Sequence, residues 1–374
     1  MKTRGRYLRL FVTSALSPRL IGIDAARGLA LIGMMAVHIF SARDPDQSIS
    51  TAYFIASGRS SALFAVLAGV GLGLANGRTV PPQNRGLRAA TTATIVRAAV
   101  IGVIGLILGE LQSGVAVILV NYGFLFLAGS LFLGLRGRTL LWMGSTWVVV
   151  GPILSHLIRM RLPAPTLDVP GFDSLAQPAT LLREMFFTGY YPVFSWMAYL
   201  WIGMGLGRLD LKKLGLRAML VGAAAATAAK VGSGFLLEQI GALRFLDELP
   251  TQFFGVTPTT TWWYLAVSVP HSATPFDLGH TIGTALFVIG LCLLIARLVG
   301  WIAAAGAMTL SLYTFHVAIL ATGAGKDNRP SLFLIHAAAA LAFGLLWRRF
   351  VGRGPLESLT ASASETARDV VVNQ

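Results

Sequence analysis

Long apolar stretches recur along the whole chain, and they limit its possible folds more than any other feature. Hydrophobic residues make up 55% of the 374 residues and charged residues only 12%, about half of what a soluble domain carries. About 20 apolar residues form a helix that can cross the roughly 30 Å hydrocarbon core of a bilayer. The chain is therefore predicted to be an all-α, polytopic integral membrane protein.

The apolar stretches predict about ten transmembrane helices. They cover residues 20–40, 52–76, 92–112, 117–135, 140–159, 190–208, 214–236, 277–298, 302–322 and 331–350. Residues 1–19 would then be a basic cytosolic segment and residues 20–351 a single transmembrane domain. Residues 352–374 would form a polar cytosolic tail, which we expect to be disordered.

The distribution of basic residues predicts the orientation in the membrane. With the N-terminus in the cytosol, 21 of the 30 lysine and arginine residues fall on the cytosolic side. This bias follows the positive-inside rule, and an even number of spans places both termini in the cytosol. It also explains the net charge of +14 without nucleic acid as a partner. Frequent alanine and arginine are typical of a GC-rich bacterial genome, so we expect the bacterial plasma (inner) membrane.

Three ionisable residues, Asp24, Arg27 and His38, lie within the first apolar stretch. On a helix they share one side, because Arg27 follows Asp24 by three residues and precedes His38 by eleven. Arg27 could be an interfacial anchor paired with Asp24, and His38 could be a hydrogen-bonded core histidine. Ionisable side chains are costly inside a membrane and are usually functional, so His38 is the stronger candidate.

The stretch that carries them, IDAARGLALIGMMAVH, resembles the first core helix of the transmembrane acyltransferase superfamily. Arg27 and His38 keep the Arg-x10-His spacing of bacterial acyltransferase-three type proteins. Asp24, Arg27 and Gly28 keep the Asp-x-x-Arg-Gly start of heparan-alpha-glucosaminide N-acetyltransferase-like proteins. Further resemblances follow in the order of the family at residues 58–75, 189–209, 306–316 and 354–357.

The resemblance implies transfer of an acyl group from cytosolic acyl-CoA to a glycan across the membrane. His38 would be the general base, Arg27 would bind the donor or polarise its carbonyl, and Asp24 would orient Arg27. Gly28 would belong to the donor site. A neutral imidazole suits the base and a guanidinium suits anionic groups. We expect a continuous cavity from the cytosolic face past Arg27 to His38, and direct transfer and an acyl-histidine intermediate both stay open.

Four further residues are candidates for substrate contact, each with a simpler alternative. Tyr313 and His316 share a helix face and could line the same tunnel, or be core residues bonded to backbone. Asn121 could contact the acceptor or cap a helix. Trp196 could stack on a sugar ring or anchor the chain at the interface.

Three arginines are further candidates for donor contact. Arg59 lies within the second span, where it needs a partner or a wet cavity, so it could touch a substrate or form a structural pair. Arg85 and Arg88 lie in an inner loop and could bind CoA phosphates, or serve only as orientation signals.

The histidines show no metal-binding spacing, and no metal is expected. His271, Asp277 and His280 are close in sequence and are expected to form a polar region at the outer vestibule. His156 and His336 are expected to serve packing alone.

These observations favour a membrane acyltransferase that uses acyl-CoA, with acetyl as the expected group, and modifies an envelope glycan or glycolipid. The alternative is a transporter or flippase for a lipid-linked or anionic solute, without covalent chemistry. A non-catalytic scaffold is a third hypothesis. Membrane lipid is an expected partner, and a homodimer is possible.

Overall fold

The computed structural model describes residues 20–373, so the predicted basic segment 1–19 lies outside the described residues. This part of the chain is all-helical, as predicted, and forms no β-sheet beyond one isolated bridge between Arg43 and Ile49. The α-helices are α2 (Ile21–Ile39), α3 (Thr51–Ala56), α4 (Arg59–Ala75), α5 (Asn84–Gly109), α6 (Leu119–Ser130), α7 (Gly137–Arg159), α8 (Pro178–Arg183), α9 (Val193–Gly207), α10 (Gly215–Gly234), α11 (Pro275–Leu294), α12 (Gly300–Gly306), α13 (Thr309–Ala321), α14 (Arg329–Phe350) and α15 (Pro355–Asn373). Short 3-10 or π segments are η1 (Phe172–Ala176), η2 (Glu184–Thr188), η3 (Leu211–Lys213), η4 (Phe235–Gln239), η5 (Ala242–Phe245) and η6 (Trp262–Ala266).

Seven helical segments are long and apolar enough to cross a membrane, or eight if the bent pair α12 and α13 counts as one span. The predicted number of about ten is not confirmed. Each predicted stretch is helical, but α6 and α9 have only 12 and 15 residues. They reach about 18 and 22 Å, less than the roughly 30 Å core. Nearly all of α9 is buried, so protein rather than lipid surrounds it.

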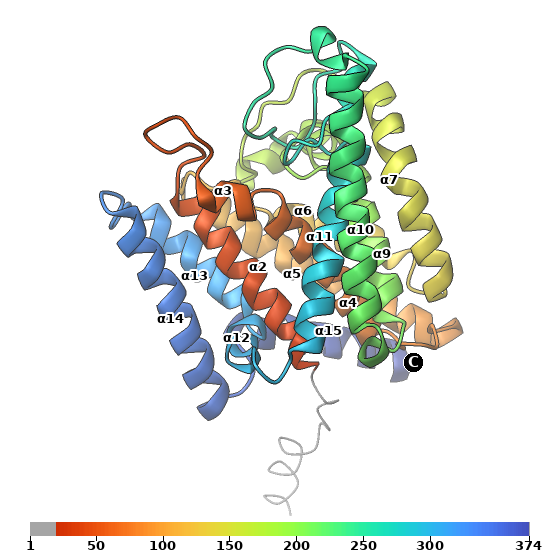
Figure 1. The fold of residues 1–374 in the computed structure, drawn as a ribbon. Helices are drawn as coiled ribbons and strands as arrows, with labels where there is room; N and C mark the ends of the chain where they lie inside the picture. Colours follow the sequence, from red (N-terminus) through yellow and green to blue (C-terminus); the bar gives the residue numbers. More distant parts are fainter. Residues whose placement is uncertain (1–19, 374) are drawn as a thin grey trace, which may run out of the picture.

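The centre of the bundle is formed by α2, α4 and α9, with α11, α10 and α7 on one side and α12, α13 and α14 on the other (Figure 1). Helices α4 and α9 approach closely through small residues, Gly69 and Gly73 on α4 and Gly203 and Gly207 on α9. A Cβ on Gly69 would lie 2.3 Å from the carbonyl oxygen of Leu200, and one on Gly203 would lie 2.0 Å from that of Val66. Only glycine permits this backbone contact.

Helices α12 and α13 meet at a bend of 71°. The first packs along the beginning of α2, where a Cβ on Gly306 would lie 1.7 Å from the carbonyl oxygen of Asp24. After the bend, α13 passes the later half of α2 (Figure 1). The bend therefore brings α13 beside the end of α2 that carries His38.

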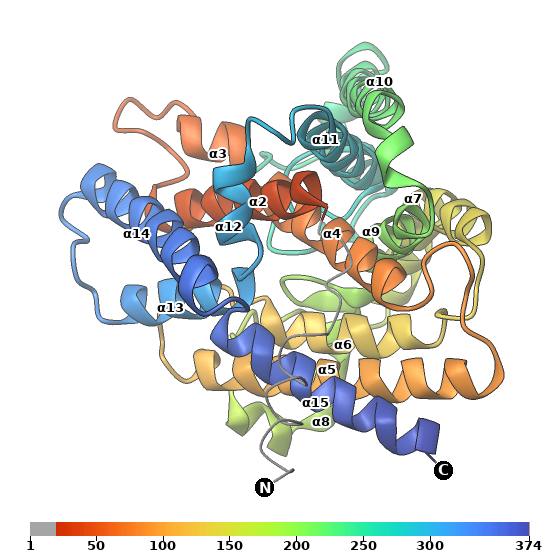
Figure 2. The ribbon, with the colours of Figure 1, turned by 90° about the horizontal axis from the view of Figure 1, so that it is seen from below.

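The expectation of a disordered C-terminal tail is wrong. Residues 355–373 form α15, which lies along α5 at the end of the bundle where α2 begins (Figures 1 and 2). Pro355 begins the helix at a position where its missing N–H costs nothing. Thr360, Ala361 and Ser364 form its buried face, because residues three and four apart share one side of a helix. This face is small and weakly apolar, and so the composition alone suggested disorder.

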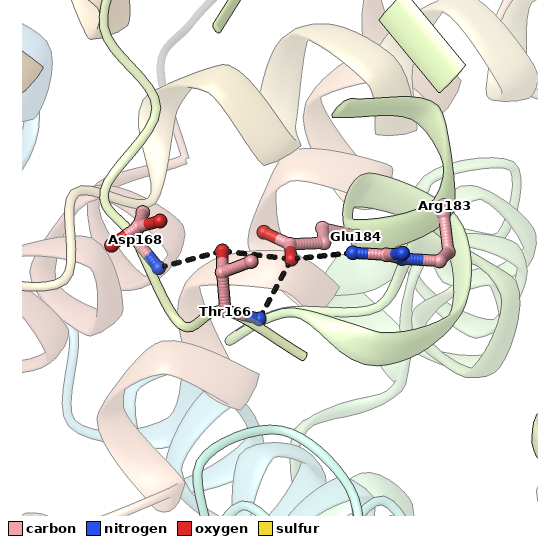
Figure 3. Close-up of polar contacts among 4 residues, drawn as sticks. All are labelled: Thr166, Asp168, Arg183 and Glu184. Carbon is pink, nitrogen blue, oxygen red and sulfur yellow. Dashed lines mark hydrogen bonds and ion pairs between the residues drawn. The ribbon is translucent and has the colours of Figure 1, made fainter. Parts of the chain in front are cut away.

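At the opposite end, a buried carboxylate joins two parts of the long segment between α7 and α9 (Figure 3). Glu184 Oε1 accepts hydrogen bonds from the backbone N–H and the hydroxyl of Thr166, both at 2.9 Å, and pairs with Arg183 at 3.1 Å. Glu184 begins η2, which leads directly to Tyr190 and Tyr191. The cluster therefore fixes the chain before two tyrosines that line the cavity around His38.

Candidate functional site

The predicted polar side of α2 is present, and its first two members pair. Arg27 Nη1 donates to Asp24 Oδ1 at 3.0 Å, and Asp24 is buried. Asp24 Oδ2 is also buried and has no hydrogen-bond partner among the described residues. The ion pair holds the guanidinium of Arg27 against its own helix.

Arg27 lines a cavity of about 240 Å³, the inner cavity, between α2, α4, α5, α6, α13 and α15. Its wall is largely apolar but contains a second guanidinium, that of Arg97 from α5. Arg97 forms no ion pair with any of residues 20–373. The charges of three arginines, Arg27, Arg353 and Arg368, act on it, together with the single negative charge of Glu365. The inner cavity thus lies in a positive region suited to an anionic ligand.

Helix α15 contributes Glu357 and Thr360 to the wall of the inner cavity. The Glu357 carboxylate accepts from the backbone N–H of Leu310 at 2.7 Å, and from the backbone N–H and hydroxyl of Ser311 at 3.1 and 2.6 Å. The two backbone N–H groups lie in the first turn of α13, where N–H groups have no partner within the helix. Glu357 therefore fixes α15 to α13, and its carboxylate oxygens are engaged in capping the N-terminus of α13.

His38 lines a second cavity of about 420 Å³, the outer cavity, near the C-terminal end of α2. Serine, tyrosine, glutamine and histidine side chains give it a polar wall. They are Tyr53, Ser60, Ser61, Tyr190, Tyr191, Gln252 and His271. No carboxylate, lysine or arginine lines it among the described residues. The outer cavity suits a polar, uncharged ligand such as a sugar.

The inner and outer cavities meet at Met34, which lines both. The expected continuous cavity is therefore divided into two. Tyr313 lines the inner cavity, and its ring lies 6.1 Å from that of His38. Met34 and Tyr313 therefore lie where the inner cavity comes nearest to His38.

His38 is hydrogen-bonded to a second histidine, and that histidine to a third. His38 Nδ1 lies 3.2 Å from Nε2 of His316 on α13, and His316 Nδ1 lies 2.7 Å from Nδ1 of His336 on α14. His316 was a candidate from its spacing to Tyr313. The expectation that His336 serves packing alone misses this bond, since no sequence signal joins residues 20 positions apart on different helices.

His271 faces His38 across the outer cavity from the loop before α11. Its backbone has a φ of 59°, a left-handed conformation that is uncommon for residues other than glycine. Burial lowers the pKa of His271 to about 4, so its imidazole is neutral near pH 7. This histidine adds a hydrogen-bonding group without charge.

Several predicted candidates lie outside both cavities. Arg59 donates to His280 Nε2 at 3.1 Å and to the carbonyl of Phe54, and it lines an apolar groove that adjoins the outer cavity at Phe40, Ala56 and Ser60. Gly28 packs on α12, where a Cβ would lie 2.6 Å from Ile302 Cγ2. Arg85 and Arg88 are exposed on the first turns of α5, two to three turns before Arg97.

Asn121 and Trp196 are buried beside the outer cavity and do not line it. Asn121 Nδ2 donates to the carbonyl of Tyr191 at 3.1 Å. The ring of Trp196 packs edge-on against Tyr191 and Tyr199, with centroids 5.2 and 5.1 Å away. Both residues therefore support Tyr191, which does line the cavity. Within residues 20–373, no group of three or more histidine, cysteine or acidic residues is arranged to hold a metal ion.

A family model for the catalytic part of heparan-alpha-glucosaminide N-acetyltransferase matches residues 19–234, more than half of the chain. The matched range includes Asp24, Arg27, His38 and Arg97, whereas α13, α14 and α15 follow it. Comparison with curated proteins and with solved structures gives no match. The match and the apolar helices together indicate a membrane acetyltransferase. The chain belongs to the heparan-alpha-glucosaminide N-acetyltransferase catalytic family.

Proposed function

We propose that this protein transfers an acetyl group from acetyl-CoA in the inner cavity to an amino or hydroxyl group of a glycan in the outer cavity. The observation that carries the proposal is the position of both cavities along one helix. Arg27 lines the inner cavity, His38 lines the outer cavity, and Met34 lines both. We place the N-terminal end of α2 and both termini in the cytosol of a bacterium, in agreement with the charge distribution.

The two cavities suit the two substrates. Acetyl-CoA carries its phosphates at one end and its thioester at the end of a long, narrow arm. Arg27 and Arg97 would pair with phosphate or carbonyl oxygens, and the narrow apolar space would hold the arm. The thioester carbon would then lie near Met34 and Tyr313, within reach of an acceptor beside His38.

His38 would act as the base. As the acceptor nitrogen or oxygen attacks the thioester carbon, His38 Nε2 takes the proton of the acceptor. The carbon–sulfur bond breaks, and the thiolate of CoA receives that proton to leave as the thiol. General acid–base catalysis of this kind contributes about 10²- to 10⁴-fold in rate.

The test is acetyl transfer by the purified protein in lipid nanodiscs. Acetyl-CoA labelled in its acetyl group is incubated with amino sugars and neutral sugars, and labelled sugar and free CoA thiol are measured. We expect transfer by the wild type and none by His38→Ala. His156→Ala is the matched control, because His156 is a buried histidine on α7 that lines neither cavity.

The same preparation separates enzyme from transporter. If no donor gives CoA thiol with any sugar and acetyl-CoA does not bind, the proposed function is wrong. Uptake of sugar into proteoliposomes without release of CoA thiol would instead favour transport.

A further inference from the structure

We propose that His316 and His336 are positioning residues, which together with His38 form a chain of three imidazoles. The chain fixes the tautomer of His38 and shares the proton that His38 takes from the acceptor. This inference rests on the proposed function for its role in catalysis, but the chain itself can be tested without that function.

The geometry places His316 at the centre of the chain. Both of its ring nitrogens are engaged, Nε2 with His38 at 3.2 Å and Nδ1 with His336 at 2.7 Å. The ring of His316 is nearly parallel to that of His38, at 15°, and perpendicular to that of His336, at 88°. Three helices, α2, α13 and α14, each supply one histidine, so the packing of the helices holds the rings in register.

Hydrogen-bonding rules leave two arrangements for three neutral rings. A neutral imidazole has one donor and one acceptor nitrogen, and each shared contact needs one of each. In the first arrangement, His38 Nδ1 donates to His316 Nε2 and His316 Nδ1 donates to His336 Nδ1. His38 Nε2 then carries a lone pair at the outer cavity and is ready to act as a base. In the second, both bonds reverse and His38 Nε2 carries a proton.

Proton movement along the chain balances. When His38 Nε2 takes the proton of the acceptor, the Nδ1 proton of His38 can move to His316 Nε2. The Nδ1 proton of His316 then moves to His336 Nδ1, so the single positive charge spreads over three rings. The reverse shift returns a proton to His38 Nδ1 and the positive charge to His38, and the CoA thiolate then takes the proton that His38 Nε2 has held since the attack. No proton is gained or lost by the chain over one turnover.

The surroundings explain why an imidazole takes the orienting role. In serine hydrolases a carboxylate orients the catalytic histidine. Here no carboxylate lines the outer cavity or the apolar groove beside His316 and His336, among residues 20–373. The other titratable groups facing His38 are His271 across the cavity, Tyr313 from α13, and Tyr53, Tyr190 and Tyr191 in the cavity wall. None of these is hydrogen-bonded to a ring nitrogen of His38 among the described residues.

Kinetics of acetyl transfer test the positioning role. We expect His316→Phe to lower kcat about 100-fold and His336→Leu about 10-fold, with KM for acetyl-CoA within about threefold. His316→Gln and His336→Asn keep groups that can accept or donate a hydrogen bond. The kcat of each is therefore expected to be at least threefold higher than that of the apolar variant at the same position. Imidazole added to His336→Ala should restore activity, because His336 lines a groove of about 690 Å³. His156→Phe is the control for loss of a buried histidine.

The pattern of variants decides between positioning and packing. If the polar and apolar variants lose activity equally at both positions, or match His156→Phe, the positioning role is wrong. A positioning role also moves the pH profile of kcat, because His38 loses the partners that share its proton. An unchanged profile in His316→Gln and His336→Leu would count against the proposal.

Nitrogen NMR of the full chain in nanodiscs, with labelled histidine, tests the chain without any activity. We expect two couplings across N–H···N hydrogen bonds in the wild type, and neither in His316→Phe. His336→Leu should keep only the coupling between His38 and His316. Absence of both couplings in the wild type would overturn the inference, even if acetyl transfer is observed. Couplings in a protein without transferase activity would refute the proposed function and leave the chain in place.

Discussion

The inner and outer cavities share Met34 but differ in their chemistry. The inner cavity has two guanidinium groups and the helix-capping carboxylate of Glu357 in an otherwise largely apolar wall, and the outer cavity has histidine, tyrosine and serine side chains without a formal charge. Arg27 and His38 are about 16 Å apart along α2. Cations that attract a donor therefore do not lie beside the base, where their charge would oppose its protonation. In the proposed function, recognition of the anionic donor and transfer of the proton would therefore take place at separate sites.

Removing the imidazole of His38 should impair acetyl transfer in the outer cavity and leave donor binding in the inner cavity intact. We expect His38→Gln to lower kcat for acetyl transfer at least 100-fold, because general base catalysis contributes about 10²- to 10⁴-fold. The Kd for acetyl-CoA, measured by calorimetry, should change less than about threefold. A large loss of donor binding would show that His38 holds the donor, and the two cavities would then not be separate in function.

Removing the guanidinium of Arg97 should weaken binding of acetyl-CoA in the inner cavity. Hydrogen bonds to charged groups contribute about 1.5–3 kcal/mol, so Arg97→Gln is expected to raise the Kd for acetyl-CoA roughly 10- to 100-fold. The change in kcat at saturating donor should be small, and added salt should weaken wild-type binding more than binding by the variant.

Arg88→Gln is the matched control for Arg97→Gln. Both arginines lie on α5, but Arg88 is exposed and does not line the inner cavity. We expect no more than a threefold change in Kd for this variant. If Arg88→Gln weakens binding as much as Arg97→Gln, the donor binds at the surface position predicted from the sequence.

The boundary between the two cavities can be changed at Met34. Met34→Trp should fill the passage and lower kcat about 10-fold, because displacement of reacting groups by even 1 Å is costly. Binding of CoA itself should be retained. Met34→Leu conserves volume and is the control. Transfer by Met34→Trp at the wild-type rate would show that the acetyl group does not pass this residue.

The sequence predicts the side of α2 that carries Asp24, Arg27 and His38 because helix periodicity alone aligns them. The small residues four apart, Gly69 and Gly73 on α4 and Gly203 and Gly207 on α9, also allow close backbone approach, but their spacing does not identify the partner helix. Both features depend on spacing within single helices. Arg27 and His38 could therefore be found without any knowledge of the tertiary structure.

The sequence does not place Arg97 or His336 in the candidate site, because their positions there depend on how the helices pack. Arg97 looks like any basic residue near the start of a span, and only the packing of α5 against α6, α13 and α15 places it in the inner cavity. His336 follows His316 by 20 residues on another helix, so no periodicity links them. The composition of the tail does not predict α15 for a similar reason, since this helix is stabilised by its contacts with α5 and α13 and not by its own apolar content.

The hydrogen bonds that join α15 to the first turn of α13 should have a smaller effect, which concerns the stability of the fold. Glu357→Ala removes three hydrogen bonds to the beginning of α13 and should lower the free energy of unfolding by about 1–2 kcal/mol. A lower melting temperature in detergent, with retained secondary structure by circular dichroism, is the expected result. Glu365→Ala, on the exposed side of α15, is the control. Equal melting temperatures for both variants would show that Glu357 does not stabilise α13.

The smallest expected effect is on the pH dependence of the folding stability, and it arises from the neutral imidazole of His271 in the outer cavity. Folded His271 stays neutral until its pKa of about 4, whereas in the unfolded chain a histidine is protonated near pH 6.5. Between these values the unfolded state binds more protons, so stability falls as the pH is lowered from about 6.5 to 4. His271→Gln cannot be protonated, and its melting temperature should fall less than that of the wild type between pH 7.5 and 4.5. An equal fall in both proteins would mean that His271 is already protonated in the folded cavity, and the outer cavity would then carry a charge as the inner one does.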